Sequence, residues 1–179
     1  MKKLAFIAVL SAAASTHVLA ADGTITIEGM VTDKTCDITT PAGKSFTVNL
    51  PTVSKSTLAN AGDVAGRTPF TINLAKCSAG KVATFFEPGS TVDFTTGRLK
   101  NQAAGESVAK NVDVQLLGSN NQVIKVIQGT DKGAQVNSQW VDVKEQGTAD
   151  LNYYAEYFAN AAATAGKVTS SVQYTIIYQ

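Results

Sequence analysis

Apolar and polar residues alternate along most of this chain, which is the period of two expected for β-strands rather than the 3.6-residue period of helices. A run of this kind can bury one face and leave the other in water. We therefore expect strands over the apolar runs at Ile25 to Val31, Phe46 to Leu50, Phe70 to Leu74, Val82 to Phe86, Val112 to Leu116, Val123 to Ile127, Leu151 to Phe158 and Val168 to Tyr178.

Short segments that favour turns separate these runs. They are rich in Gly, Asn, Asp, Ser or Pro and lie at residues 42–44, 61–63, 87–90, 118–121 and 129–133. Short strands with such punctuation are typical of a β-sandwich, so the predicted fold class is all-β. Residues 52–65 lack a strand pattern and are expected to form a loop or one short helix. Residues 159–165 are alanine-rich, but they stand between two strand runs and are predicted to be a connection.

The first twenty residues have the features of a secretory signal peptide. Lys2 and Lys3 precede an apolar run from residue 4 to residue 14, and small or apolar residues stand at 18–20. The apolar run is too short to span a bilayer, so cleavage is predicted after Ala20. The alternative is a short N-terminal anchor that stays in place.

Charge and histidine content narrow the possible functions. The chain has 15 basic and 14 acidic residues, and without Lys2 and Lys3 the two kinds nearly balance, so nucleic acid is not an expected partner. The one histidine, His17, lies within the predicted signal peptide. A mature chain without histidine cannot build a Ser-His-Asp triad or a His-ligated metal site, so neither an enzyme nor a cofactor or metal site is expected. A small periplasmic enzyme that uses lysine or carboxylates is the remaining catalytic alternative.

Cys36 and Cys77 are the only cysteines. In an exported protein such a pair predicts one disulfide, and closing a loop of about 42 residues is worth roughly 4 kcal/mol in the chain-entropy model. Two free thiols or a two-ligand metal site are the alternatives.

Several independent motifs, spread from one end of the predicted mature chain to the other, carry a family resemblance. They are an alternating segment before Cys36 with Gly29 seven residues ahead of it, Pro-Phe-x-Ile-x-Leu-x-x-Cys at 69–77, Tyr-Phe-Ala at 157–159, Gly166 fourteenth from the end and a penultimate Tyr178. With these motifs the sequence resembles the subunits of chaperone–usher fimbriae, the type 1 and P pilus family of Gram-negative bacteria.

The resemblance implies an incomplete immunoglobulin-like β-sandwich that lacks its last strand and carries an extended N-terminal donor strand. The implied organisation is a signal peptide at 1–20, a donor-strand extension at 21–33 and a pilin domain at 34–179. A neighbouring copy would supply the missing strand, which is one of the known modes of β-strand addition.

The N-terminal segment suits this role. Every second residue from Gly23 to Val31, namely Gly23, Ile25, Ile27, Gly29 and Val31, would face the groove of the neighbour. Burial of the three apolar side chains would contribute roughly 5–8 kcal/mol before ordering costs. The resemblance implies that Gly29 enters a shallow pocket and that Val31 is engaged first. Met30 is a poor fit to the polar outward face.

The resemblance also implies the receiving edge and the partners. The chaperone and acceptor-groove edge would comprise Gly166, Val172, Tyr174, Ile176, Tyr178 and Gln179. Expected partners are other copies of the chain, a periplasmic chaperone, an outer-membrane usher, and tip or adaptor pilins. The chain would travel through the periplasm to the cell surface and form part of a fimbrium that supports adhesion.

Some alternatives stay open from the sequence. The subunit is expected to be the major shaft subunit, with a minor adaptor as the alternative. A monomeric, secreted, carbohydrate-binding sandwich is a further alternative, in which Trp140 could stack on a sugar rather than serve as a core or loop anchor. The segment from Gly23 to Val31 could instead be a first strand paired within its own sheet.

Overall fold

The computed structural model describes residues 22–127, 130–131 and 133–179. The predicted signal peptide therefore lies outside the described residues. The chain divides into two units, Met1–Val31 and Thr32–Gln179. Within the described part, no helix is both long enough and apolar enough to cross a membrane.

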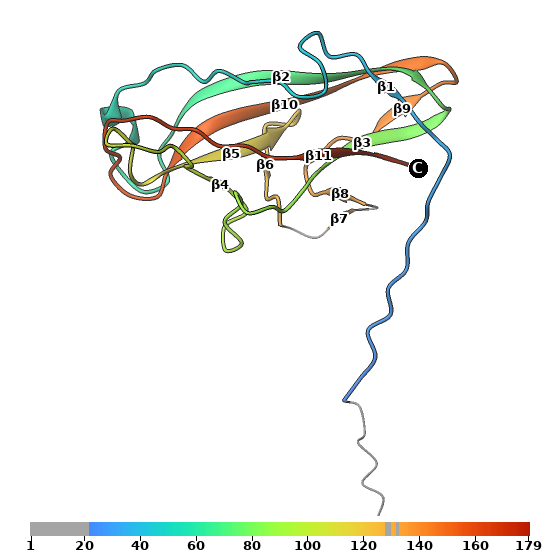
Figure 1. The fold of residues 1–179 in the computed structure, drawn as a ribbon, viewed down its shortest axis with the longest axis horizontal. Coiled ribbons are helices and arrows are strands. Elements are labelled where there is room, and N and C mark those ends of the chain that lie inside the picture. The colour runs from blue at the N-terminus through green and yellow to red at the C-terminus, as the bar shows by residue number, and fades with distance from the viewer. Residues whose placement is uncertain (1–21, 128–129, 132) are drawn as a thin grey trace, which may run out of the picture. The chain divides into compact units, whose positions relative to one another are not determined.

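The larger of two main sheets is antiparallel and contains the longest strands (Figure 1). Its order is β1 (Asp37–Ile38), β2 (Val64–Cys77), β10 (Gly147–Ala159), β5 (Val112–Gly118) and β4 (Leu99–Lys100), with β6 (Val123–Ile124) paired to β5. Alternation explains the packing of β10, where Leu151, Tyr153 and Ala155 are buried on one face.

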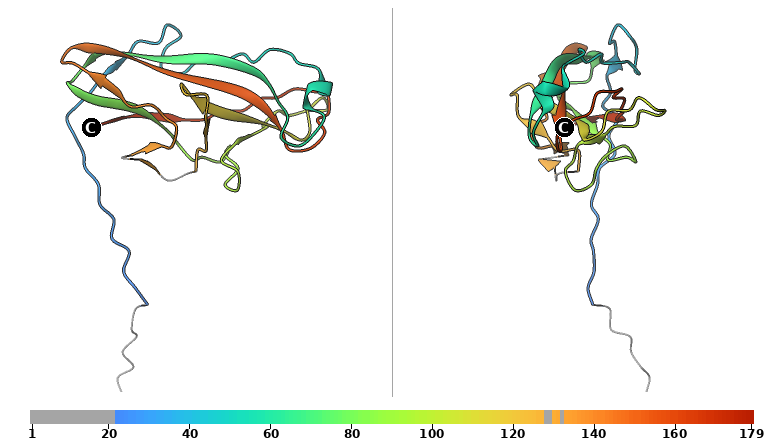
Figure 2. Two further views of the ribbon diagram at one scale, coloured as in Figure 1. Left: turned by 180° about the vertical axis from the view of Figure 1, so that it is seen from behind. Right: turned by 90° about the vertical axis from the view of Figure 1, so that its left-hand side faces the viewer.

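A smaller antiparallel sheet supplies the second layer of the sandwich (Figures 1 and 2). Its order is β11 (Tyr174–Tyr178), β3 (Gly80–Phe86) and β9 (Val141–Val143). Phe86 on β3 meets Tyr153 on β10 edge to face, with 5.1 Å between ring centroids. The core thus lies between the sheets, as the predicted all-β sandwich requires. The small sheet ends at β11, and no strand among the described residues lies beside its second edge.

The remaining elements are short. A 3-10 helix, η1 (Lys55–Leu58), lies in the segment where a loop or short helix was predicted, and β7 (Thr130–Asp131) pairs with β8 (Ala134–Gln135). Residues 160–165 form no strand, which confirms the predicted connection except at Ala159, the last residue of β10. The Cys36–Cys77 disulfide is also confirmed.

Four predicted strands are absent from the structure or shorter than expected. Residues 22–31 and 44–50 form no strand, the run from Val123 forms a strand of only two residues, and the last run is a strand only from Tyr174. The alternative in which Gly23 to Val31 is a first strand of its own sheet is therefore also wrong. In 44–50 the alternation is nevertheless real, because Phe46, Val48 and Leu50 pack against the core.

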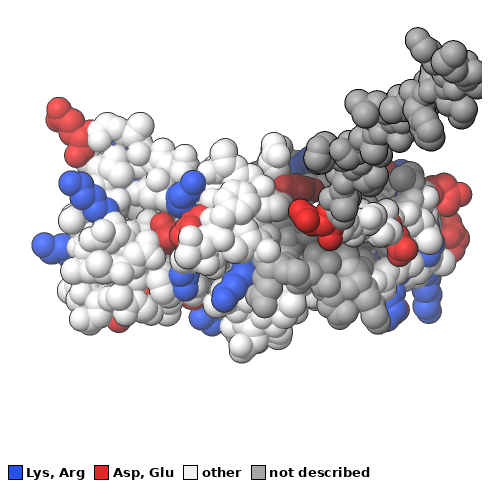
Figure 3. Space-filling model, turned by 90° about the horizontal axis from the view of Figure 1, so that it is seen from below, with Lys and Arg blue, Asp and Glu red and all other residues white. Residues whose placement is uncertain are grey.

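On the face shown in Figure 3, basic and acidic side chains are interspersed rather than gathered by sign. This mixture agrees with the near balance of charge in the sequence.

One ion pair joins a buried carboxylate to an exposed arginine, on the face of the larger sheet that points away from Tyr153. Arg67 Nε donates to Glu156 Oε2 at 2.8 Å, and the side chains are 41% and 3% exposed, respectively. Gln115 Nε2 also donates to Glu156 Oε1. Hydrogen bonding to Glu156 raises the pKa of Arg67.

Replacing Arg67 by Met should leave the Glu156 carboxylate buried without its cation. We expect the free energy of unfolding, measured in urea, to fall by about 3 kcal/mol. The matched control is Lys76→Met, which removes the exposed pair between Lys76 and Asp37 and should cost under about 1 kcal/mol. Equal losses of unfolding free energy in the two variants would contradict the conclusion that Arg67 stabilises a buried carboxylate.

Candidate functional site: an open groove and an exposed arm

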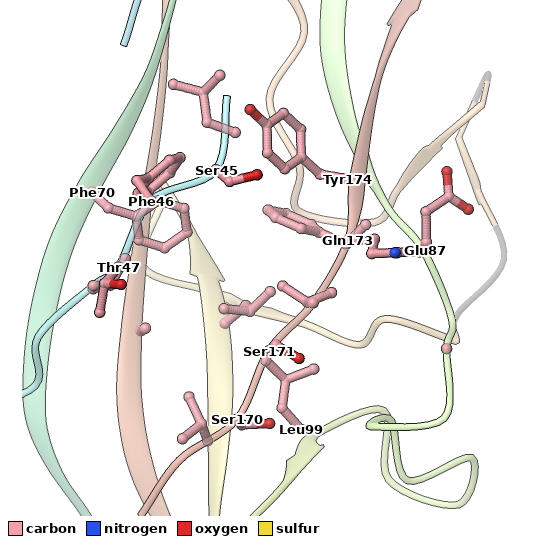
Figure 4. A pocket seen from close by; sticks show the side chains of 18 of the residues that line it. Ser45, Phe46, Thr47, Phe70, Glu87, Leu99, Ser170, Ser171, Gln173 and Tyr174 are labelled. Atoms are coloured by element: carbon pink, nitrogen blue, oxygen red, sulfur yellow. The ribbon is translucent and has the colours of Figure 1, made fainter. Parts of the chain in front are cut away.

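A long groove runs between the two edges where a further strand would fit. Its volume is about 1200 Å³, and its walls are residues 44–50 on one side and 168–176 on the other. Apolar side chains of both sheets form its floor, among them Phe70, Ile72, Phe86, Val114 and Leu116. Figure 4 shows Phe46 and Tyr174 on opposite walls.

The wall at 168–176 presents an unused hydrogen-bonding edge. Gln179 and Lys81 exchange both backbone bonds, and Glu87 N–H donates to the Gln173 carbonyl at 2.8 Å. In an antiparallel pair such bonds recur at every second residue, so the odd-numbered residues of β11 face β3. The N–H and C=O groups of the even-numbered residues point the other way, along the groove.

The same alternation, in which odd-numbered residues bond away from the groove, continues through residues 167–171, before β11 begins. The carbonyl of Thr169 accepts from Gln102 N–H, and that of Ser171 accepts from the Thr91 hydroxyl. Lys167 N–H donates to Ser107 and its carbonyl accepts from Ala109. An open backbone edge therefore extends along the even-numbered residues, which also turn their half-buried side chains inward: Val168, Ser170, Val172, Tyr174 and Ile176.

The opposite wall is equally unpaired. Residues 46–50 have no assigned secondary structure, and residues 45–50 make no backbone hydrogen bond to any described part of the chain. This explains why an alternating segment that packs Phe46, Val48 and Leu50 on the core is not a strand. Open backbone groups on both sides of an apolar groove are a template for strand pairing, and a single added strand could bond to both walls at once.

A hydrogen bond joins the two walls. The Tyr174 hydroxyl donates to the Lys44 carbonyl at 2.8 Å. Burial raises the pKa of Tyr174 and of Tyr157, which also lines the groove. Both phenols are therefore neutral near pH 7, and the groove is uncharged over most of its apolar length.

The five predicted donor residues lie in the described part of the N-terminal unit. Ile25, Ile27 and Val31 are 90%, 91% and 100% exposed, and Met30 is exposed as well. A Cβ built on Gly23 or Gly29 would meet no atom within 4 Å. Within one subunit, then, nothing requires glycine at either position, and four large apolar side chains are left in water.

The predicted acceptor edge divides into three groups. Val172, Tyr174 and Ile176 line the groove. Tyr178 and Gln179 lie beyond its end, where the Tyr178 hydroxyl accepts from Cys36 N–H and Gln179 pairs with Lys81. Gly166 lines a second depression of about 230 Å³, and a Cβ on it would collide with the backbone of Val108 and Ala109.

Sequence reasoning missed part of the groove. Val168 and Ser170 share the parity of Val172 and could have been included on that signal alone. The wall at 44–50 was read as an ordinary strand. The floor needed the tertiary structure, because β2, β3, β4, β5 and β10 all contribute to it. Among the described residues, no group of three or more His, Cys, Asp or Glu side chains could hold a metal ion.

A β-sandwich with an open groove along one edge can accept a further strand from another molecule, and an exposed alternating arm has the pattern of such a strand. Comparison with known proteins gives the same class. The family model described as type-1 fimbrial protein, A (FimA) matches residues 50–179. The P pilus rod subunit PapA aligns with a TM-score of 0.57 at 19% identity, over 80% of this chain and 99% of PapA, and so shares its incomplete immunoglobulin-like fold.

Curated relatives are similar in sequence over nearly the whole chain. The major fimbrial subunit SMF-1 of Stenotrophomonas maltophilia (strain K279a) is 70% identical, over 93% of this chain and 98% of its own length. The F17 fimbrial protein of Escherichia coli is 44% identical over the full length of both. The chain belongs to the type-1 fimbrial protein family, and it is a structural fimbrial subunit.

Proposed function

We propose that copies of this chain polymerise when the N-terminal arm of one subunit fills the groove of the next. The arm is defined as residues 22–31, and its donor residues are Gly23, Ile25, Ile27, Gly29 and Val31. The observation that carries the proposal is the pair of walls, residues 44–50 and 168–176, whose backbone edges toward the groove are open, on either side of an apolar groove of about 1200 Å³.

The groove fits a β-strand better than another kind of ligand. Both walls offer backbone donors and acceptors, and a β-strand is the structure that can satisfy two such edges together. The floor is apolar, so the side chains that point into it must be apolar or absent, as they are at the five donor positions. We propose an antiparallel arrangement, because both main sheets of the subunit are antiparallel throughout.

The role of Gly29 can be separated from subunit folding. Since a Cβ at Gly29 meets nothing within 4 Å, Gly29→Val should leave the melting temperature of the isolated subunit unchanged. In the assembled state the same side chain must enter the groove, and we expect fibre yield by electron microscopy to fall at least tenfold. The control is Glu28→Val, an outward-facing neighbour that should assemble normally. Equal fibre yields for the two variants would contradict the proposed facing of the arm.

The open edge also motivates the proposed transport partners. An apolar groove with unpaired strand edges is a template for aggregation. A periplasmic chaperone that covers Val172, Tyr174 and Ile176 would prevent this until an outer-membrane usher brings in the next subunit. In this proposal Tyr178 and Gln179 fix the end of β11 for the chaperone, and Gly166 fixes its approach. Adaptor or tip pilins would join the fibre through the same arm-and-groove contact.

We further propose that this chain is the major shaft subunit, which the 70% identical relative described as a major fimbrial subunit supports. The proposed organisation is a signal peptide at 1–20, a donor extension at 21–33 and a pilin domain at 34–179. Export would run through the periplasm to the surface. Electron microscopy of cells that express this chain with a matching chaperone and usher tests the whole proposal, since absence of fibres despite secreted subunit would refute it.

A further inference from the structure

One polar side chain interrupts the apolar inward row of the wall at 168–176. Its members are Val168, Ser170, Val172, Tyr174 and Ile176. The hydroxyl oxygen of Ser170 is buried and has no hydrogen-bond partner in the described structure. A buried hydroxyl without a partner is unfavourable, so whatever lies over Ser170 in the fibre decides whether that penalty stays or is removed.

We propose that Ser170 sets the register in which the arm of a second copy lies in the groove, by accepting only a glycine opposite it. This inference rests on the proposed function. In the antiparallel arrangement that covers all five inward wall residues with the five donor residues, Gly29 lies opposite Ser170. The other pairs are Val31 with Val168, Ile27 with Val172, Ile25 with Tyr174 and Gly23 with Ile176.

Glycine is the one residue type in the donor row that can satisfy Ser170. The other donor residues would cover the hydroxyl with methyl groups, which cannot hydrogen-bond. Opposite Gly29 there is no side chain in the way, so rotation about the Ser170 Cα–Cβ bond can bring the hydroxyl to the backbone of the arm. The pair therefore exchanges an unsatisfied polar atom for a hydrogen bond.

The two neighbouring antiparallel registers, and the parallel register with full coverage, fail this condition. An antiparallel shift of two residues one way puts Ile27 over Ser170 and leaves Ile176 uncovered. The shift the other way puts Val31 over Ser170 and leaves Val168 uncovered. A parallel arm that covers all five wall residues puts Ile25 over Ser170. A single polar residue in an apolar seam can thus specify alignment, as a buried polar residue does in coiled coils.

The rest of the wall cannot make this distinction. Valine, tyrosine and isoleucine all accept an apolar side chain, so a two-residue slip would exchange one apolar contact for another. The open edge offers the same backbone donors and acceptors at every second residue. Without Ser170, neighbouring registers would differ mainly by one uncovered wall residue.

Engineered disulfides between outward-facing positions can read the register without touching the groove. Glu28 lies on the outward face of the arm, and the candidate partners Thr169, Ser171 and Gln173 are exposed outward residues of the wall. Cysteine at 28 is combined with cysteine at one partner in the full chain, and intersubunit cross-links are measured in assembled fibres. Directly opposite residues in an antiparallel pair are close enough for a disulfide.

The proposed register places residue 28 opposite Ser171. With Ser170 present, we expect the 28–171 pair to cross-link at least tenfold more than 28–169 or 28–173. In the Ser170→Val background, cross-linking should spread to 28–169 or 28–173. The control Val172→Ala, which shortens an apolar wall residue, should keep the single 28–171 pattern.

Three outcomes would overturn the inference, and they are distinguishable. A single 28–171 pattern that survives Ser170→Val means that Ser170 does not set the register. A dominant 28–169 or 28–173 link with Ser170 present means that the register itself is wrong. Absence of every intersubunit link in fibres that have formed would refute the proposed function and the inference with it.

Discussion

Ile27→Asp is expected to abolish fibres while leaving the subunit folded. The residue is 91% exposed in the single subunit, so a charge there costs nothing before assembly. In the proposed complex the carboxylate would be buried against Val172 on an apolar floor, at a cost of several kcal/mol. Each 1.4 kcal/mol lowers the equilibrium constant for binding tenfold, so we expect fibre yield by electron microscopy to fall at least a thousandfold.

The matched control is Thr26→Asp, one residue away and on the outward face of the arm. It adds the same charge to the same segment and should assemble nearly as the unmodified chain does. Circular dichroism of both purified variants should be unchanged. Loss of fibres in both variants would show that the arm tolerates no charge on either face. Normal fibres from Ile27→Asp would show that the arm is not part of the assembly contact.

Val172→Asp is expected to abolish assembly from the other side of the contact. Val172 is half-buried in the middle of the inward row and packs against the core, so the carboxylate would enter the groove at its centre. The arm of this variant is intact. We expect it to be unable to receive a strand, and therefore to give no fibres and little chaperone complex.

Ser171→Asp is the control for this wall, because Ser171 is the adjacent, exposed residue on the outward face. Its backbone carbonyl, which accepts from Thr91, is unaffected by the substitution. Fibre yield by electron microscopy and the amount of co-purified chaperone are the two measurements. Equal loss in Val172→Asp and Ser171→Asp would point to a folding defect rather than to a blocked groove.

The sequence predicted the elements whose partners lie in the same chain. The runs at Phe70, Val82, Val112 and Leu151 are strands because each alternating face meets the opposite layer of the sandwich. Residues 46–50 show the limit of this reasoning. Their alternation correctly indicates which side chains turn inward, yet the ladder that defines a strand needs a neighbour on the groove side.

The site was predictable in part, for a related reason. Alternation along 168–176 indicates that the even-numbered residues face inward. The exposed arm is visible in the sequence as an alternating segment ahead of Cys36. The groove floor was not predictable, because Phe70, Phe86 and Val114 come together only when the two sheets pack. The buried Glu156 carboxylate and its pair with Arg67 were missed as well, since charged residues on strands are normally expected to face water.

Co-expression of Ile27→Asp and Val172→Asp tests the central contact most directly. The first variant can receive an arm but cannot donate one, and the second can donate but cannot receive. We predict that the mixture forms a one-to-one dimer by light scattering, whereas neither variant alone forms dimers or fibres. Failure of the mixture to form that dimer, with both variants folded, would contradict the account that one copy completes the sandwich of another.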